Sequence, residues 1–282
     1  MNFIYRKKIE YNILNKVNIN KIVIILILIF YIIGYYARKN IINISKTKLI
    51  NKNIKLINNN ELKNFKSYSQ CLEDLILFSF LYEIKRGFYI DIGANDPDQI
   101  SVTKAFYLRG WNGINIEPLP EKFKSLSIKR VRDINLPIGI GAKKGNSVLY
   151  PMGAGSTTSK IYSKNQYKQL NISIDTMKNI CEKYIPKGKE IHFCKIDIEG
   201  DEKNALLGFD FENYRPKIFC IESTKPGTYI PCFDNWEYIL LRNDYSFIYE
   251  YKINRFYIDN RVNGLKEKLF YVQENIKNYK IK

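Results

Sequence analysis

The hydrophobic positions of the chain change character after residue 66. From there on, short apolar and β-branched runs bounded by Gly, Pro or charged residues predict strands at 87–92, 113–116, 135–140, 191–196, 217–223, 246–251 and 255–259. Segments with helical spacing predict helices at 70–84, 102–108, 121–128, 173–184, 202–207 and 236–242, and an amphipathic, lysine-rich helix after 262. Strands that alternate with helices are typical of an α/β fold, and we predict a doubly wound, mostly parallel sheet.

The N-terminal part has a hydrophobic feature of its own. Residues 22–36 (IVIILILIFYIIGYY) contain no charged residue and lie between Lys21 and the pair Arg38 and Lys39. Such a run is shorter than the roughly 20 residues that span a bilayer, but interfacial Tyr, Ala37 and snorkelling Lys or Arg extend its reach. We predict a transmembrane or signal-anchor helix over 22–37; a buried helix of the soluble domain is the alternative. No small-residue cleavage site follows, which argues against a cleaved signal peptide.

These patterns divide the chain into five parts. We expect a basic tail at 1–21, the membrane helix at 22–37, a polar linker rich in Asn and Lys at 38–66, one α/β domain at 67–262 and a basic C-terminal helix at 263–282. The chain is thus predicted to be a single-pass membrane protein with one globular domain.

The net charge of +17 suggests nucleic-acid binding, but the distribution of the charge argues against it. The first 66 residues hold 13 Lys or Arg against two Glu, and so carry +11 of the excess. Basic residues that flank an apolar run favour lipid headgroups, and no RNP, zinc-finger or helix-turn-helix pattern accompanies them. We therefore expect a membrane partner and no nucleic acid. Because basic residues lie on both sides of the run, they do not define its orientation.

The cysteines bear on the compartment. There are five, without a CxxC pair: Cys71, Cys181, Cys194, Cys220 and Cys232. Cys194 and Cys220 lie inside apolar strand-like runs, which favours buried free thiols over disulfides or metal ligands. An odd number without a disulfide framework favours a reducing, cytosolic setting for the domain.

Acidic residues end four of the predicted strands: Asp91, Glu117, Asp197 and Glu222. Open parallel sheets bind ligands outside the carboxyl ends of their strands, at the point where the strand order reverses. We therefore expect the functional site at these four strand ends.

The loop after the first of these strands, DIGANDPD, contains glycine but no GxGxxG motif. Asp91, Asp96 and Asp98 in this loop are expected to repel a pyrophosphate, which needs positive potential and close backbone approach. Glu117 ends the next strand 26 residues later, where an acid holds a ribose diol in nucleotide folds. This pattern favours a cationic ligand that has a ribose and no phosphate, a description that fits S-adenosylmethionine.

The sequence resembles the FkbM family of methyltransferases over about residues 68–259. The motifs, in order, are YSQCLEDLILFSF, GFYIDIGANDPDQISVTKAFYLRGWNGINIEPLP, ISIDTMKNICEKY and FCKIDIEGDEKNALLGFD. The resemblance implies a class I methyltransferase fold, which is Rossmann-like, S-adenosylmethionine as cofactor, and an oxygen acceptor on a sugar or natural product. The chain departs from the family pattern at Asp201, where the family usually has Ala, and in the N-terminal apolar segment, which lies outside the family core.

The resemblance also implies cofactor contacts at two groups of residues. Asp91 and Gly93 would let the methionyl part of the cofactor approach the backbone, with Asn95 shaping the turn. Glu117 would accept hydrogen bonds from both ribose hydroxyls, since a carboxylate has two acceptor oxygens; a plain surface acid is the alternative. A further group opens the helix that the family places over the cofactor: Gln70, Glu73 and Asp74. The alternative for these three residues is a purely structural role, as the solvated and capped start of the helix.

Methyl transfer is an in-line displacement in which the enzyme aligns the acceptor and removes its proton. Candidates for the general base are Asp197 and Glu199, with Lys195 as a weaker one. Metal binding by the same acids is an open alternative, but the single histidine, His192, offers no His cluster and is expected only to begin its strand, so we assign no metal ligand.

The predicted function is therefore an S-adenosylmethionine-dependent methyltransferase that acts on an oxygen of a sugar, glycan or other hydroxylated small molecule at a membrane. The first alternative is a catalytically inactive, membrane-tethered binding module with a methyltransferase fold. The second is a nucleotide-sugar or dinucleotide enzyme, which the acidic first loop disfavours.

Overall fold

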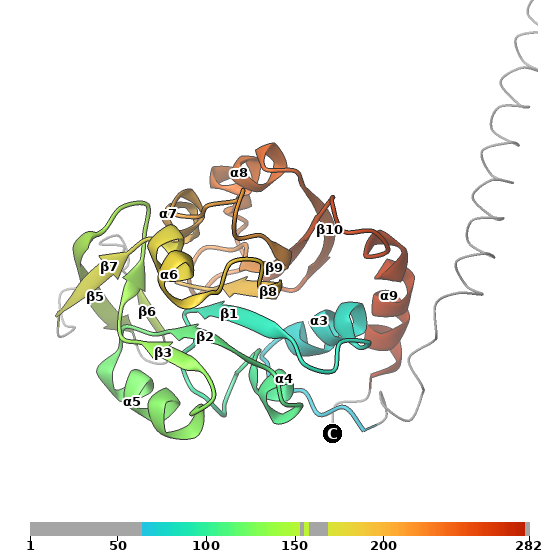
Figure 1. Ribbon diagram of the computed structural model, residues 1–282, viewed down its shortest axis with the longest axis horizontal. Coiled ribbons are helices and arrows are strands. Elements are labelled where there is room, and N and C mark those ends of the chain that lie inside the picture. Colours follow the sequence, from blue (N-terminus) through green and yellow to red (C-terminus); the bar gives the residue numbers. More distant parts are fainter. Residues whose placement is uncertain (1–63, 153–154, 158–168, 280–282) are drawn as a thin grey trace, which may run out of the picture. The chain divides into compact units, whose positions relative to one another are not determined.

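The computed structural model describes residues 64–152, 155–157 and 169–279 (Figure 1). The predicted basic tail, the membrane helix at 22–37 and nearly all of the predicted linker lie outside these residues. Within the described part of the chain, no helix is long and apolar enough to cross a membrane.

A seven-stranded sheet forms the centre of the described domain, in the order β10-β11-β9-β8-β1-β2-β3. The strands are β1 (Phe88–Ile92), β2 (Asn112–Ile116), β3 (Ile134–Leu136), β8 (Ile191–Ile196), β9 (Pro216–Glu222), β10 (Tyr245–Tyr251) and β11 (Asn254–Asp259). From β3 to β9 all neighbours are parallel, and only β11 runs antiparallel to both of its partners. The chain proceeds outward from β1 through β2 to β3, and then from β8 to β9 on the other side. The strand order therefore reverses between β1 and β8, and the predicted doubly wound, Rossmann-like sheet is confirmed.

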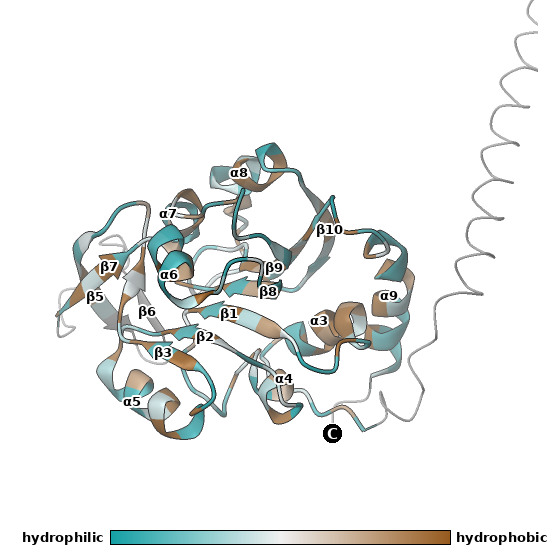
Figure 2. Ribbon diagram, in the orientation of Figure 1, coloured by the Kyte–Doolittle hydropathy of each residue, from teal (hydrophilic) through white to brown (hydrophobic). Residues whose placement is uncertain are grey.

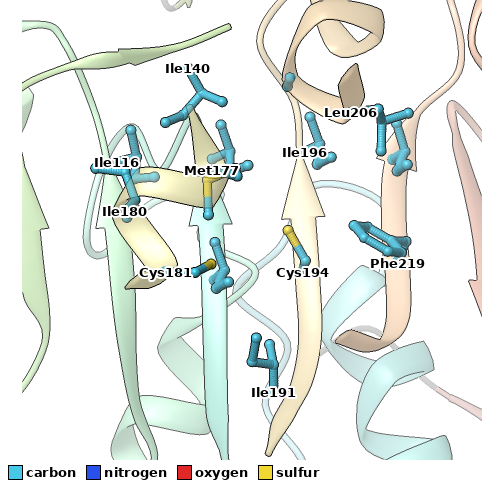
Figure 3. Close-up of a cluster of buried hydrophobic side chains, with 14 of the residues drawn as sticks. Ile116, Ile140, Met177, Ile180, Cys181, Ile191, Cys194, Ile196, Leu206 and Phe219 are labelled. Carbon is cyan, nitrogen blue, oxygen red and sulfur yellow. The ribbon is translucent and has the colours of Figure 1, made fainter. Parts of the chain in front are cut away.

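Helices cover both faces of this sheet. They are α3 (Glu73–Leu81), α4 (Lys104–Leu108), α5 (Pro120–Lys129), α6 (Met177–Tyr184), α7 (Glu202–Leu207), α8 (Glu237–Arg242) and α9 (Leu269–Asn278). On one face, Met177, Ile180 and Cys181 of α6 pack over Ile116 and Ile196 of the strands (Figure 3). On the other face α3 is buried and largely hydrophobic along its length (Figure 2). The two apolar layers explain why the parallel strands are continuous hydrophobic runs.

A second sheet of four strands differs from the prediction. Its order is β4-β7-β5-β6, with β4 (Gly139–Ile140), β5 (Gly145–Met152), β6 (Gly155–Thr157) and β7 (Leu170–Asp175). The single strand predicted at 135–140 is in fact two strands, β3 and β4, in different sheets. The helix predicted at 173–184 begins only at Met177, because Leu170, Ile172 and Ile174 alternate with polar residues and form β7.

The packed domain extends beyond the predicted limits at both ends. Phe65 is fully buried, and its ring lies 4.9 Å from that of Phe78 in α3. After residue 262, α9 packs on α3, with Val272 fully buried and the Asn275 amide donating to Ser79. Limits at 67 and 262 would therefore remove residues of the core.

The cysteines confirm the predicted free thiols. None of the five forms a disulfide, and Cys181, Cys194 and Cys220 are buried. Cys181 of α6 and Cys194 of β8 lie in the same apolar layer, whereas Cys220 of β9 faces α3. These three behave as small hydrophobic side chains.

Candidate functional site

A cavity of about 280 Å³ lies between the carboxyl ends of β1, β2 and β8 and the four-stranded sheet. In Figure 1 that second sheet stands beside the ends of β1, β2 and β3. Its apolar wall comes largely from isoleucine and leucine: Ile92, Ile116, Leu119, Ile138, Ile140, Leu149, Ile172, Ile174 and Ile198. Its polar lining consists of Gln70, Asn95, Glu117, Lys195, Asp197, Glu199 and Asp201. An apolar cavity with a few convergent polar groups at the strand-order reversal is the usual form of a ligand site in this fold.

Gly93 makes the turn that follows β1. Its φ is +79°, and its N–H donates to the carbonyl of Ile116 at 3.0 Å. A Cβ at this position would lie 1.9 Å from the backbone oxygen of Asp197. Glycine is required here for two reasons. The ends of β1 and β8 approach each other too closely to leave room for a Cβ, and the left-handed φ favours glycine.

Glu117, at the end of β2, holds the next part of the same turn. Its Oε2 accepts the N–H of Asn95 at 2.9 Å, and its Oε1 accepts the N–H of Leu119 at 2.9 Å. Asn95 takes a left-handed φ of +50°. Burial raises the pKa of the Glu117 carboxyl, and the two backbone hydrogen bonds oppose this shift. Each carboxylate oxygen keeps acceptor capacity for a ligand in the cavity that Glu117 lines.

Lys195 is the positively charged side chain among the described residues that line the cavity. Its Nζ donates to the carbonyl of Gly93 at 3.0 Å and lies 3.3 Å from Asp197 Oδ2 and 3.7 Å from Asp91 Oδ1. Burial lowers the pKa of this ammonium, but Asp197 and Asp91 raise it by more, so that the pKa lies above its usual value. Lys195 is thus held as a cation that ties the ends of β1 and β8 together, and it has no lone pair with which to accept a proton.

The turn after β8 presents Glu199 to the cavity. Glu202 clamps this turn, because its Oε1 accepts the N–H groups of Ile198 at 3.3 Å and Gly200 at 3.0 Å. Glu199 itself has a φ of +56°. Burial and then the charge of Asp197 raise the pKa of Glu199 to about 7, against a smaller opposing effect of Lys195. A carboxylate with this pKa can exchange a proton near neutral pH.

Glu222 adds a further acid beside Asp197. The register pairs Ile196 of β8 with Ile221 of β9, so the next residues, Asp197 and Glu222, are neighbours across the two strands. Glu222 is 6% exposed, and its Oε2 has no hydrogen-bond partner among the described residues. Burial and the neighbouring acids, Asp197 first, raise the pKa of Glu222. Sequence reasoning placed Glu222 at a strand end without giving it a role, and it did not single out Glu202.

The comparison with protein families now adds to this geometry. The family described as "Methyltransferase FkbM domain" matches residues 91–247, which is more than half of the chain and runs from the end of β1 into β10. The chain belongs to the FkbM methyltransferase family. Searches of curated proteins and of solved structures found no match.

The structure gathers seven of the ten predicted site residues of the FkbM domain around one cavity. They are Gln70, Gly93, Asn95, Glu117, Lys195, Asp197 and Glu199. The other three, Glu73, Asp74 and Asp91, do not line the cavity. The predicted helix over 70–84 begins only at Glu73, so Gln70 precedes α3.

Glu73 and Asp74 hold the segment that carries Gln70. Asp74 accepts hydrogen bonds from the hydroxyl of Ser67 at 2.6 Å and the N–H of Tyr68 at 2.7 Å. Glu73 accepts from the N–H of Cys71 at 2.7 Å and from the side chain of Asn254 at 2.8 Å. Both acids are therefore buried groups that hold this segment in place, so the solvated helix start is wrong for them, and the cofactor contact stays a prediction.

The acids of the first loop also act differently from the prediction. Asp98 pairs with Lys104 at 2.6 Å and with Lys129, and Asp96 pairs with Lys122 at 3.3 Å. Their charges are therefore balanced by lysines of α4 and α5 and do not face the cavity. Asp91 is almost fully buried and accepts a hydrogen bond from Thr103 at 3.0 Å. The acidic character of the FkbM cavity comes instead from Glu117, Asp197, Glu199 and Asp201.

His192 lies far from these acids, at the amino end of β8. Its Nδ1 accepts the N–H of Phe88 at 3.1 Å. Burial, with a further contribution from Lys217, lowers the pKa of His192 to about 4, so the ring is neutral at pH 7. Over the described residues, no group of three or more His, Cys, Asp or Glu side chains is arranged to hold a metal ion.

Proposed function

We propose that this FkbM methyltransferase uses S-adenosylmethionine to methylate a hydroxyl oxygen of a sugar, glycan or other hydroxylated small molecule. The observation that carries the proposal is the pairing of two acids across one cavity, with Glu117 at the end of β2 and Glu199 after β8. Glu117 suits a ribose diol, and Glu199 suits the acceptor proton.

The cavity fits S-adenosylmethionine better than a dinucleotide. Glu117 offers acceptor oxygens to the two ribose hydroxyls, and the nearby apolar residues Leu119 and Ile138 suit an adenine ring. The charge of Lys195 is shared by Asp91 and Asp197, so little positive potential is left for a pyrophosphate. When bound, the cofactor supplies a methyl group on a positively charged sulfur, and carboxylates favour that charge.

Glu199 is the proposed general base. It lines the cavity, its turn is fixed by Glu202, and its pKa of about 7 leaves a substantial carboxylate fraction at neutral pH. Asp197 is tied to Lys195 and lies beside Glu222, and we assign it to orienting the acceptor and the end of β8. Lys195 would act as a positioning residue through Gly93 and Asp197.

We further propose that residues 22–37 anchor the protein in a membrane as a single span, on the sequence grounds given above. The five free cysteines support a reducing compartment for the catalytic domain. The acceptor would then be a molecule that the domain meets at or near the membrane surface.

Calorimetric titration of the full chain in detergent micelles, with S-adenosylmethionine and separately with NAD, tests the cofactor. A screen of methyl transfer over glycans, lipids and small hydroxylated molecules then tests the reaction. Binding of S-adenosylmethionine alone, with transfer to an acceptor oxygen, is expected. Binding without transfer to any acceptor class would indicate an inactive binding module, and binding of NAD alone would indicate a dinucleotide enzyme.

A further inference from the structure

The loops that lead into the parallel strands gather at the edge of the sheet opposite to the cavity. Because β8, β1, β2 and β3 are parallel neighbours, the segments before them lie side by side along their amino ends. These segments are 185–190, 82–87, 109–111 and 130–133. Helices α6, α3, α4 and α5 each end at one of these loops and turn their C-terminal ends to the same side. We call the surface formed by these loops and helix ends the amino-edge face.

The amino-edge face is basic. Its exposed Lys and Arg side chains come from all four loops: Lys85, Arg86, Arg109, Arg132, Lys187 and Lys189. The exposed acids of the same loops are Glu83 and Glu190, and each is paired with a lysine, Lys268 at 3.1 Å and Lys217 at 2.9 Å. These four loops therefore present an excess of positive charge, whereas the loop before β9 (208–215) at the same edge adds the acids Asp210 and Glu212.

Contacts between neighbouring loops make this face continuous. Lys189 lies over the ring of Phe88 at the start of β1, 5.6 Å from its centroid. Lys85 and Arg109 line one depression on the surface. Arg132 lies over the ring of Tyr107, 3.8 Å from its centroid, and so joins the ends of α4 and α5.

Exposed apolar side chains accompany the positive charge. Leu108 at the end of α4 is 61% exposed, and Ile128 and Val131 at the end of α5 are 65% and 73% exposed. Apolar side chains flanked by Lys and Arg are the pattern with which peripheral proteins enter the headgroup region of an anionic bilayer.

Asn64 and Phe65, with which the described part of the chain begins, also lie at this face. Asn64 lines the depression that Lys85 and Arg109 form. The guanidinium of Arg109 lies 4.8 Å from the ring centroid of Phe65.

We propose that the amino-edge face binds an anionic phospholipid surface and holds the cavity on the side of the domain away from that surface. The proposal is independent of the methyltransferase assignment, since it uses none of the residues of the cavity. It commits to lipid because this face combines positive charge with exposed apolar side chains, and because the same chain carries an uncharged apolar run at 22–36 between basic residues.

Trypsin tests the proposal directly, because it cleaves after the basic residues of this face. The full chain is placed in nanodiscs of phosphatidylcholine alone or of phosphatidylcholine with phosphatidylglycerol, and cleavage after Lys187 and Lys189 is timed by mass spectrometry. Each Lys or Arg near an anionic surface contributes a factor of about five in binding. We expect cleavage at these two sites to be slowed by roughly tenfold or more in the anionic discs, and to recover at high salt. Cleavage after Lys252, which is exposed in the turn between β10 and β11 beside the carboxyl end of β9, should be equally fast in both discs.

Two charge-reversal variants complete the test. Lys85→Glu with Arg86→Glu removes charge from the amino-edge face, keeps the reporter sites and should abolish the protection. Lys143→Glu with Lys144→Glu changes two exposed lysines between β4 and β5, and should keep it. Equal cleavage rates in the two discs, equal loss of protection in both variants, or the same protection by an oligonucleotide in the absence of lipid would overturn the proposal.

Discussion

The two ends of the central sheet carry the same kinds of loops but opposite chemistry. At the carboxyl end, Asp91, Glu117 and Glu222 are buried and Asp197 is partly exposed, and backbone N–H groups or Lys195 hold several of these acids in place. At the amino end most of the exposed charges of these loops are basic, and the buried ring of His192 is neutral. Buried acids that line a cavity are arranged for chemistry, whereas exposed bases are arranged for contact with a surface. Because these strands run in the same direction, the candidate active site and the proposed lipid-binding face lie at opposite ends of the sheet.

The largest effect is expected at the turn after β8. Glu199→Gln should lower methyl transfer by roughly a hundredfold to ten-thousandfold, because a positioned base contributes that much, while cofactor affinity changes little. Asp197→Asn should also lower turnover far more than cofactor binding. In the wild type the rate should rise with pH through about 7, as Glu199 loses its proton, and level off above. The exposed Glu212→Gln is the matched control. Turnover within a few-fold of wild type in both single variants, at saturating cofactor, would remove these acids from the mechanism.

The second-largest effect is expected on stability, when glycines at the two ends of the central sheet are replaced. Gly93→Ala places a Cβ against the Asp197 carbonyl and should lower the free energy of unfolding by about 3 kcal/mol, with loss of cofactor binding. Gly110→Ala, at the amino end, shares the left-handed φ but meets nothing within 4 Å, so it should cost only about 1 kcal/mol. Urea unfolding measures both. Equal losses would mean that the approach of β1 and β8 does not require glycine.

Glu117→Gln should weaken the binding of S-adenosylmethionine by about 1–3 kcal/mol, because a charged acceptor for the ribose hydroxyls is lost. The amide oxygen keeps one of the two backbone hydrogen bonds while its NH2 group faces the other N–H, so stability should fall, but by less than in Glu117→Ala. Glu117→Ala should lose stability as well, since it leaves the N–H groups of Asn95 and Leu119 without their partner. Calorimetry and thermal unfolding of both variants separate the two contributions. Unchanged cofactor affinity in Glu117→Gln would contradict the ribose assignment.

The smallest effect is expected at His192. Its folded pKa of about 4 lies below the usual 6.5, so the unfolded chain takes up a proton first as the pH falls. The wild type should therefore lose stability between pH 6.5 and 4, about 2 kcal/mol at pH 5, and His192→Gln should lose less. Denaturant unfolding at pH 7.5 and pH 5 measures the difference. Parallel losses in the two proteins would show that His192 does not titrate as described, and cofactor binding should be unaffected in either case.

The sequence was sufficient to predict the main sheet, because β1, β2, β8, β9, β10 and β11 are runs of apolar residues with clear ends. The second sheet was not predicted. Strands β5 and β6 lack such apolar runs, and β7 directly precedes α6, so that its last residues were assigned to the helix. The alternation of Leu170, Ile172 and Ile174 with polar residues was the available signal. The consequence was large, because this sheet supplies much of the apolar wall of the cavity.

Strand direction alone was enough to place the acids at one end of the sheet. It could not show which of them line the cavity and which are structural. Whether Asp98 faces the cavity or Lys104 depends on how α4 packs, and this packing is a tertiary property. Glu73 likewise accepts from Asn254, which lies 181 residues away in the sequence. Hydrogen bonds of this kind decide which acid is structural, and spacing along the chain does not encode them.

Hydrogen exchange of the full chain, with and without S-adenosylmethionine, tests the division between the two ends most directly. It needs no knowledge of the acceptor and reports on both ends in one experiment. The account predicts slower exchange at 93–96, 117–119 and 197–200 when the cofactor is present, and unchanged exchange at 82–87, 109–111 and 185–190. Protection at the amino-end loops, or no protection after β1, β2 and β8 under conditions in which the cofactor is bound, would contradict the placement of the site.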